Sequence, residues 1–139
     1  MDMYEICLLH ARSDRAMRAL IAERLEGLNI TMMEWLLLGV VSGGKGQGLT
    51  MSEIANTLQV TLPQVTALVN KLLPLKLIKQ KSASNDRRSR LVTVTSKGQL
   101  ALDDANKALN TAMGTWLDGV SKEQLSSYMA TLEKFIAAR

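Results

Sequence analysis

The sequence has little cysteine, histidine or proline, and each shortage excludes a class of protein. A single cysteine, Cys7, cannot form an internal disulfide framework, and it is typical of a protein kept in a reducing compartment such as the cytoplasm. The two prolines, the 47% hydrophobic content and the absence of any long charge run argue against a disordered chain. The one histidine, His10, has no second histidine or cysteine at metal-ligand spacing, so the sequence predicts no metal site.

Long apolar runs and catalytic motifs are also missing. No apolar segment is as long as a membrane span, and the N-terminus lacks the pattern of a signal peptide. There is no carboxylate pair, nucleophile motif or metal signature of the kinds that support catalysis. The glycine-rich residues 42–48 include Lys45 but lack the spacing and the preceding strand of a P-loop, so we expect a plain loop. We therefore expect no enzyme, no membrane protein and no cofactor.

Positive charge is gathered in one part of the chain. From Lys71 to Lys97 there are eight basic residues and one acidic residue, a net of +7; the whole chain carries +4, so the remainder sums to −3. A local basic patch on a slightly acidic body is typical of a surface that binds a polyanion. A solvated lysine-rich loop would show the same composition. The name basic patch is used below for Lys71, Lys76, Lys79, Lys81, Arg87, Arg88, Arg90 and Lys97.

Long amphipathic helices are expected at both ends of the chain. Apolar residues at helical spacing predict a first helix from Asp2 to about Gly27, with Gly27 as its C-cap. A helix of roughly 25 residues, at about 1.5 Å per residue, is long for so small a domain, so part of it should project and need a partner. A second long helix is predicted from Ser96 to near Gly119, and a last one follows Ser121.

Four capping boxes mark helix starts. In each box a Ser or Thr and a Glu or Gln three residues later satisfy each other's free backbone donors. The helix after the first box is apolar nearly all round and is expected in the core. Only Gln59 and Val60 separate the second helix from the third, which predicts a helix-turn-helix. The boxes are residues 31–34, 50–53, 61–64 and 121–124.

The second helix of this pair, from Thr61 to about Leu73, has two distinct faces. Val65, Leu68, Val69 and Leu72 follow helical spacing and are expected to face inward. The outward residues are then Pro63, Gln64, Thr66, Ala67, Asn70 and Lys71. Such a charge-poor face suits base edges, with Gln64 or Asn70 reading adenine and Ala67 contacting a thymine methyl. An ordinary solvated face is the alternative, but such faces usually carry more Lys and Glu.

A two-stranded basic ribbon is predicted after this helix, which Pro74 should end. Leu77 and Ile78 form a short apolar strand, Ser82 to Arg90 a polar and basic turn, and residues 91–95 a β-branched return strand. A helix followed by such a ribbon can address DNA in two places, with the helix in the major groove and the ribbon tip beside it.

These segments resemble the MarR family of bacterial winged-helix regulators. The resemblance is densest over residues 49–98, and the order of the flanking helices extends it over the whole chain. It implies a dimer in which the N- and C-terminal helices of two subunits intertwine, a recognition helix beginning at Thr61 and a wing at residues 82–90. It also implies that Arg88 approaches the minor groove and that Asp86 orients the wing. The residues that carry it are 49–55, 60–69, 77–78, Asn85-Asp86-Arg87-Arg88 and 91–98.

Three positions depart from the family pattern. The family commonly has Gly where Lys76 stands and lacks Pro74, so we expect a different exit from the recognition helix, because Lys tolerates positive φ poorly. Ala67 stands where many relatives carry a basic residue, so the target DNA sequence is expected to differ from theirs.

Cys7 has two interpretations. A branch of the family senses organic hydroperoxides through a cysteine at a similar place, which would make Cys7 a redox sensor. The tyrosines that partner that cysteine are not evident here, because residues 31–35 occupy the corresponding region. The alternative is a small hydrophobic residue packed at the dimer seam.

We therefore predict a mainly α fold with a small β-wing, a winged helix-turn-helix dimerised through its N- and C-terminal helices. Residues 1–139 form one domain, with 31–98 as the DNA-binding lobe and 1–30 and 100–139 as dimerisation helices. The predicted function is sequence-specific binding of a pseudo-palindromic duplex, with half-sites roughly 10–10.5 base pairs apart, by a repressor that a small ligand or an oxidant releases. A winged-helix protein-interaction module that does not read DNA is the alternative. The predicted DNA-binding residues are Thr61, Leu62, Pro63, Gln64, Thr66, Ala67, Asn70, Lys71, Arg87, Arg88 and Arg90, with Asp86 as the wing-orienting residue.

Overall fold

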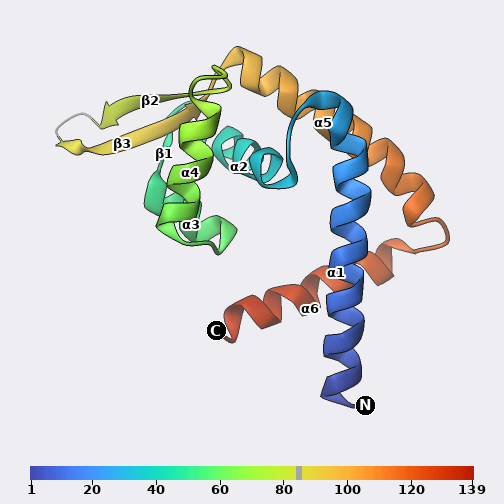
Figure 1. Cartoon of the computed structure of the whole chain (residues 1–139). Helices are drawn as coiled ribbons and strands as arrows, with labels where there is room; N and C mark the ends of the chain where they lie inside the picture. Colours follow the sequence, from blue (N-terminus) through green and yellow to red (C-terminus); the bar gives the residue numbers. More distant parts are fainter. Residues whose placement is uncertain (84–85) are drawn as a thin grey trace. The chain divides into compact units, whose positions relative to one another are not determined.

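The computed structural model describes the backbone of residues 1–83 and 86–139 and the side chains of residues 1–82 and 90–139. Within these ranges the chain is mainly helical with one small antiparallel sheet, as predicted (Figure 1). The elements are α1 Met3–Leu25, the 3-10 helix η1 Glu26–Leu28, α2 Met32–Gly43, β1 Leu49–Thr50, α3 Met51–Leu58, α4 Leu62–Leu72, β2 Ile78–Ala83, β3 Asp86–Val94, α5 Ser96–Trp116 and α6 Lys122–Ala137. The chain divides into two compact units, Met1–Leu109 and Asn110–Arg139.

All four capping boxes form as predicted and start α2, α3, α4 and α6. In the box of α4, the backbone N–H of Gln64 donates to Thr61 Oγ1 and the N–H of Thr61 donates to Gln64 Oε1. Thr95 serves α5 in a similar way, because its hydroxyl accepts from the N–H of Gly98 at 3.0 Å. Each helix start is therefore set by residues next to it in the sequence.

The core of the first unit lies where α2, α3 and α4 meet the sheet. In α4 the predicted inward residues Val65, Val69 and Leu72 are fully enclosed, and Leu68 is half-buried. Helix α2 is only partly the central helix expected from its sequence, because Gly39 is exposed and Leu36 and Val40 are half-buried. The most deeply buried side chains are Leu25, Leu37, Leu38, Val41, Ile54, Val65, Val69, Leu72, Ile78 and Val92.

The end of α1 differs from the prediction. Gly27 is not its C-cap, since the helix ends at Leu25 and the chain continues as η1. The left-handed residue that closes this turn is Asn29, with φ 54° and its N–H bonded to the carbonyl of Glu26. Asparagine tolerates this conformation better than most residues, so it performs the task expected of glycine.

The exit from α4 was expected to avoid positive φ at Lys76, and that expectation is wrong. Lys76 has φ 59°, the left-handed conformation that a glycine would adopt. Its N–H donates to the carbonyl of Leu73 at 3.0 Å, and its carbonyl accepts from the hydroxyl of Thr95 at 2.6 Å. These two hydrogen bonds hold the turn in place although the residue is a lysine.

Lys76→Gly should therefore stabilise the protein. Glycine adopts φ near 59° without the steric cost of a Cβ, which is about 1 kcal/mol, and part of this gain is offset by the greater freedom of glycine in the unfolded chain. We expect a rise in melting temperature of about 1–3 °C by circular dichroism. A melting temperature lowered by the substitution would contradict the strain assigned to Lys76.

The sheet has the order β1-β3-β2 and both pairings are antiparallel. Strand β1 was not predicted, because it has only two residues and the second, Thr50, is also the first residue of a capping box. The predicted turn at Ser82–Arg90 is mostly strand instead: Ser82 pairs with Arg90 and Ala83 with Asp86, with a bulge between Ser82 and Ala83. Figure 1 shows β2 and β3 as a two-stranded ribbon that extends away from the helices of the first unit.

Both terminal helices expose apolar side chains. Helix α1 encloses only Ile21 and Leu25, and no residue of α6 is buried. The exposed apolar residues are Met3, Tyr4, Leu8, Leu9 and Met17 on α1 and Tyr128, Met129, Phe135 and Ile136 on α6. Within the described chain no single helix is long and apolar enough to cross a membrane; Met3–Leu28 and Met32–Gly43 meet that test only jointly, as a pair bent by 79°.

Candidate nucleic-acid interface

A tight turn sets the direction of α4 relative to α3. Gln59 adopts a left-handed conformation with φ 56°, and its N–H bonds back to the last turn of α3. The N–H of Val60 donates to the carbonyl of Ala55 at 3.0 Å. Thr61 then caps α4, so Gln59, Val60 and Thr61 are the only residues between the two helices, and the tight turn of the helix-turn-helix prediction is confirmed.

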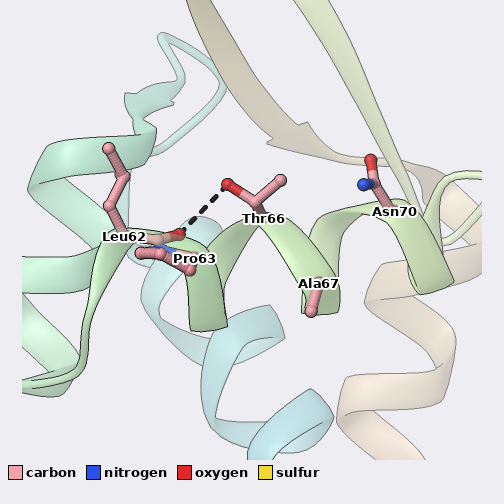
Figure 2. A pocket seen from close by; sticks show the side chains of 5 residues that line it. All are labelled: Leu62, Pro63, Thr66, Ala67 and Asn70. Atoms are coloured by element: carbon pink, nitrogen blue, oxygen red, sulfur yellow. Dashed lines mark hydrogen bonds between the residues drawn. The ribbon is translucent and has the colours of Figure 1, made fainter.

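The outer face of α4 is open to solvent along its length. Every residue predicted to face outward on α4 is exposed, and so are Thr61 and Leu62. Five of these side chains line a shallow hollow of about 470 Å³. Figure 2 shows Leu62, Thr66 and Asn70 following one another along one edge, with Pro63 and Ala67 completing the lining. The lining of this hollow is therefore mostly small and apolar, with one amide, that of Asn70.

The polar side chains of this face differ in which of their hydrogen-bonding atoms already have a partner within the protein. The hydroxyl of Thr66 donates to the carbonyl of Leu62 at 3.0 Å, which leaves its oxygen as an acceptor and its methyl group outward (Figure 2). The structure gives the Asn70 amide no partner within the described residues, so both its donor and its acceptor can meet a base edge. Gln64 is committed instead, because its Oε1 accepts from Thr61 N at 2.9 Å and from Thr61 Oγ1 at 3.1 Å. Asn70 is thus a better candidate than Gln64 for a bidentate contact to adenine.

Three lysines of the basic patch bind within the protein. Lys71 Nζ lies 3.2 Å from the buried carboxylate of Glu34. Lys81 Nζ donates to the carbonyl of Gly46 at 2.9 Å, and Lys97 Nζ donates to the carbonyl of Leu75 at 3.0 Å. Lys76, Lys79 and Arg90 are exposed, as these three lysines are. All six cations therefore lie at the surface, and Lys71, Lys81 and Lys97 also contact a carboxylate or a carbonyl of the protein.

The predicted tip of the wing is described only in part. The backbone of Asp86, Arg87 and Arg88 belongs to β3. Their side chains lie outside the described residues, so their predicted contacts with DNA and with the wing remain predictions. Arg90, whose backbone pairs with Ser82, is the arginine nearest to the tip whose side chain the structure describes.

The two remaining candidate residues, Cys7 and His10, both lie on α1. Cys7 is a free, exposed thiol on α1, and His10 is exposed on the same helix. Within the described ranges no group of three His, Cys, Asp or Glu side chains could hold a metal ion. Glu34 was predicted only as half of a capping box. Its pairing with Lys71 had no signal in the sequence, because the two residues are 37 positions apart.

A second hollow lies between α2 and α5 in the first unit. Its volume is about 300 Å³, and Trp35, Leu36, Gly39, Val40, Leu102 and Asn106 line it. Trp35 Nε1 donates to Asn106 Oδ1 at 2.8 Å. The hollow is mostly apolar, with one polar pair in its wall.

Comparison with known proteins agrees with this geometry. Residues 28–89 match the family model described as MarR family. Three solved structures share the fold over most of their length. S. aureus MepR, solved as a DNA complex, is 25% identical with a TM-score of 0.84, and the match covers 96% of this chain and 97% of MepR. The regulator BldR from Sulfolobus solfataricus is 25% identical with a TM-score of 0.83, with full coverage of both chains.

CouR from Rhodococcus jostii RHA1, solved with p-coumaroyl-CoA, is 19% identical with a TM-score of 0.84; the match covers 94% of this chain and 90% of CouR. The family match includes the whole of α4 and the turn that precedes it. These matches assign the fold as a winged helix. The three-stranded sheet, the closely spaced helices α3 and α4 and the long terminal helices agree with that assignment. Residues 28–89 therefore match the MarR family, and most of the chain shares the winged-helix fold of these three structures.

Proposed function

We propose that the chain is a homodimeric, sequence-specific regulator of transcription that binds double-stranded DNA in the cytoplasm and acts as a repressor. The observation that carries this proposal is the outer face of α4, which is exposed and charge-poor over residues 62–70 and carries the exposed amide of Asn70. Beside it, Lys79 and Arg90 on the ribbon supply outward positive charge. Small and amide side chains read base edges, while cations bind phosphates.

The exposed apolar side chains of the terminal helices support the dimer. Contiguous apolar surface on a water-soluble chain usually marks an interaction site. We assign residues 1–30 and 100–139 to this interface and residues 31–98 to the DNA-binding lobe. Two copies related by a two-fold axis would present two α4 helices to half-sites roughly 10–10.5 base pairs apart, which requires a pseudo-palindromic duplex. The proposal assigns no catalytic activity to either part.

We propose that a small, largely apolar effector releases the DNA. The hollow between α2 and α5 has the composition for such a ligand, and its volume of about 300 Å³ suits a single aromatic ring system. CouR, which shares the fold, was solved with an aromatic thioester of coenzyme A. Oxidation of the exposed Cys7 is the alternative means of release.

Substitutions at Gln64 separate base reading from helix capping. Gln64→Ala removes both the capping acceptor and any base contact, whereas Gln64→Glu keeps the box but cannot donate to a base. If Gln64 reads adenine, Gln64→Glu should relax the preference at one position per half-site, costing about 1–3 kcal/mol there. Binding to duplexes with each base at that position measures this. An unchanged preference in Gln64→Glu would assign Gln64 to capping alone.

Salt dependence tests the function as a whole. A DNA-reading regulator should bind duplexes selected from a random pool more tightly than scrambled ones, and the logarithm of its affinity should fall linearly with the logarithm of salt concentration. Fluorescence anisotropy with both duplexes across four salt concentrations makes this measurement. A protein-interaction module would show neither the preference nor the slope, and that result would contradict the proposal.

A further inference from the structure

Glu34 is a buried carboxylate at the start of α2. Its side chain is 3% exposed, and its Oε1 accepts the N–H of Thr31 at 2.9 Å to close the capping box. Its Oε2 has no hydrogen bond of good geometry within the described residues, but Lys71 Nζ lies 3.2 Å away. A buried carboxylate is costly unless a cation balances it, and the ammonium group of Lys71 supplies that balancing charge.

Lys71 belongs to the last turn of α4, immediately after Asn70, and its side chain is 59% exposed. The ion pair joins the C-terminal end of α4 to the N-terminal end of α2, two helices that also pack against each other. Because this pair links α4 to another helix, it opposes a rotation of α4 about its own axis. Such a rotation would turn the reading face, the exposed outer face of α4 over residues 62–70, away from the bases.

We infer that the Glu34–Lys71 pair is a positioning device: Lys71 orients the reading face of α4 and is not a contact to a DNA phosphate. This inference rests on the proposed function. It reassigns a residue that the sequence places among the DNA-binding cations, and it adds Glu34, which no DNA-binding pattern in the sequence indicated. Lys81 and Lys97 are likewise committed to backbone carbonyls, so internal anchoring recurs within the basic patch.

The two roles predict different effects of Lys71→Met. A lost phosphate contact weakens binding to every duplex and reduces the slope of log affinity against log salt by about 0.9 per contact. A lost positioning contact leaves the slope unchanged. It lowers only the preference for the selected duplex over the scrambled one, by about tenfold, because base contacts depend on the direction of the helix.

The experiment measures affinity for selected and scrambled duplexes at four salt concentrations for the wild type, Lys71→Met, Glu34→Gln and the double variant. Glu34→Gln retains an oxygen for Thr31 and leaves Lys71 charged, so it removes only the pairing. The double variant removes both charges, so a loss of preference in it cannot come from an unpaired buried charge. Circular dichroism checks that each variant is folded. Lys79→Met is the matched control, since Lys79 is an exposed lysine of the same patch and should flatten the slope.

We expect Lys71→Met and Glu34→Gln to lose preference to the same extent, and the double variant to lose no more than either, because all three remove one shared interaction. A flattened slope in Lys71→Met, equal to that in Lys79→Met, would overturn the inference and leave the proposed function intact. Additive losses in the double variant would overturn it as well. A wild-type protein that prefers no duplex would instead overturn the proposed function itself.

Discussion

Gly98→Ala is expected to lower the free energy of unfolding by about 3 kcal/mol, the upper end of the range for overpacking a core. Gly98 lies in the first turn of α5, where a Cβ would collide with the carbonyl oxygen of Leu77 and come within 2.8 Å of Val94 Cγ2. Neither neighbour can move easily. The carbonyl of Leu77 accepts the N–H of Thr95 at 3.1 Å, and Val94 ends the central strand β3.

The collision also affects the junction that positions the ribbon. Thr95 caps α5 through its hydrogen bond to Gly98 and holds the turn after α4 through its bond to the carbonyl of Lys76. A methyl group at Gly98 would therefore disturb both the start of α5 and the exit from α4. We expect the melting temperature to fall by roughly 10 °C in circular dichroism.

Gly114→Ala in the same helix is the matched control. A Cβ there meets nothing within 4 Å, so alanine should stabilise the helix by up to about 1 kcal/mol through its higher helix propensity. Opposite signs for the two substitutions would show that the packing at Gly98, and not glycine replacement in general, is responsible. A Gly98→Ala variant as stable as the wild type would mean that the contact between α5 and Leu77 is wrong.

Phe135→Glu is expected to dissociate the dimer and to weaken binding to the selected duplex by about a hundredfold. Phe135 is 52% exposed on α6, beside the exposed Ile136, so a charge there costs the single chain little. In a dimer the same charge would be buried in an apolar contact without a partner. Losing the second subunit removes the gain from binding two half-sites at once, which is typically 10² or more.

Lys134→Gln provides the control for this change. It alters the net charge by the same amount at the neighbouring, exposed position of the same helix but leaves the apolar side chains in place. Analytical ultracentrifugation at micromolar concentration should show a monomer for Phe135→Glu and a dimer for Lys134→Gln. If Phe135→Glu remains dimeric, α6 does not carry the interface.

Features that depend on neighbouring residues could be predicted from the sequence. The four capping boxes formed because each needs only a hydroxyl and a Glu or Gln three residues away. The two faces of α4 followed from helical periodicity, so Val65 and Val69 are buried and Thr66 and Asn70 exposed, as expected.

Features that depend on distant residues could not be predicted. Lys71 was predicted from the sequence to be a DNA-binding cation, but in the structure its ammonium group lies 3.2 Å from the carboxylate of Glu34, 37 residues earlier. Lys76 adopts positive φ in a turn that is held partly by the hydroxyl of Thr95, which donates to its carbonyl and lies 19 positions later in the sequence. Gln64 fitted both a capping box and a base reader, and only the structure shows that its acceptor oxygen is in use.

The spacing of half-sites tests most directly the claim that two copies place two α4 helices in successive major grooves. The measurement is the affinity and stoichiometry of the protein on the selected duplex and on the same duplex with five base pairs inserted at its centre. We expect two chains per selected duplex and a loss of about a hundredfold on insertion, because half a helical turn moves one half-site to the opposite side of the DNA. One chain per duplex, or equal affinity for both spacings, would contradict the account.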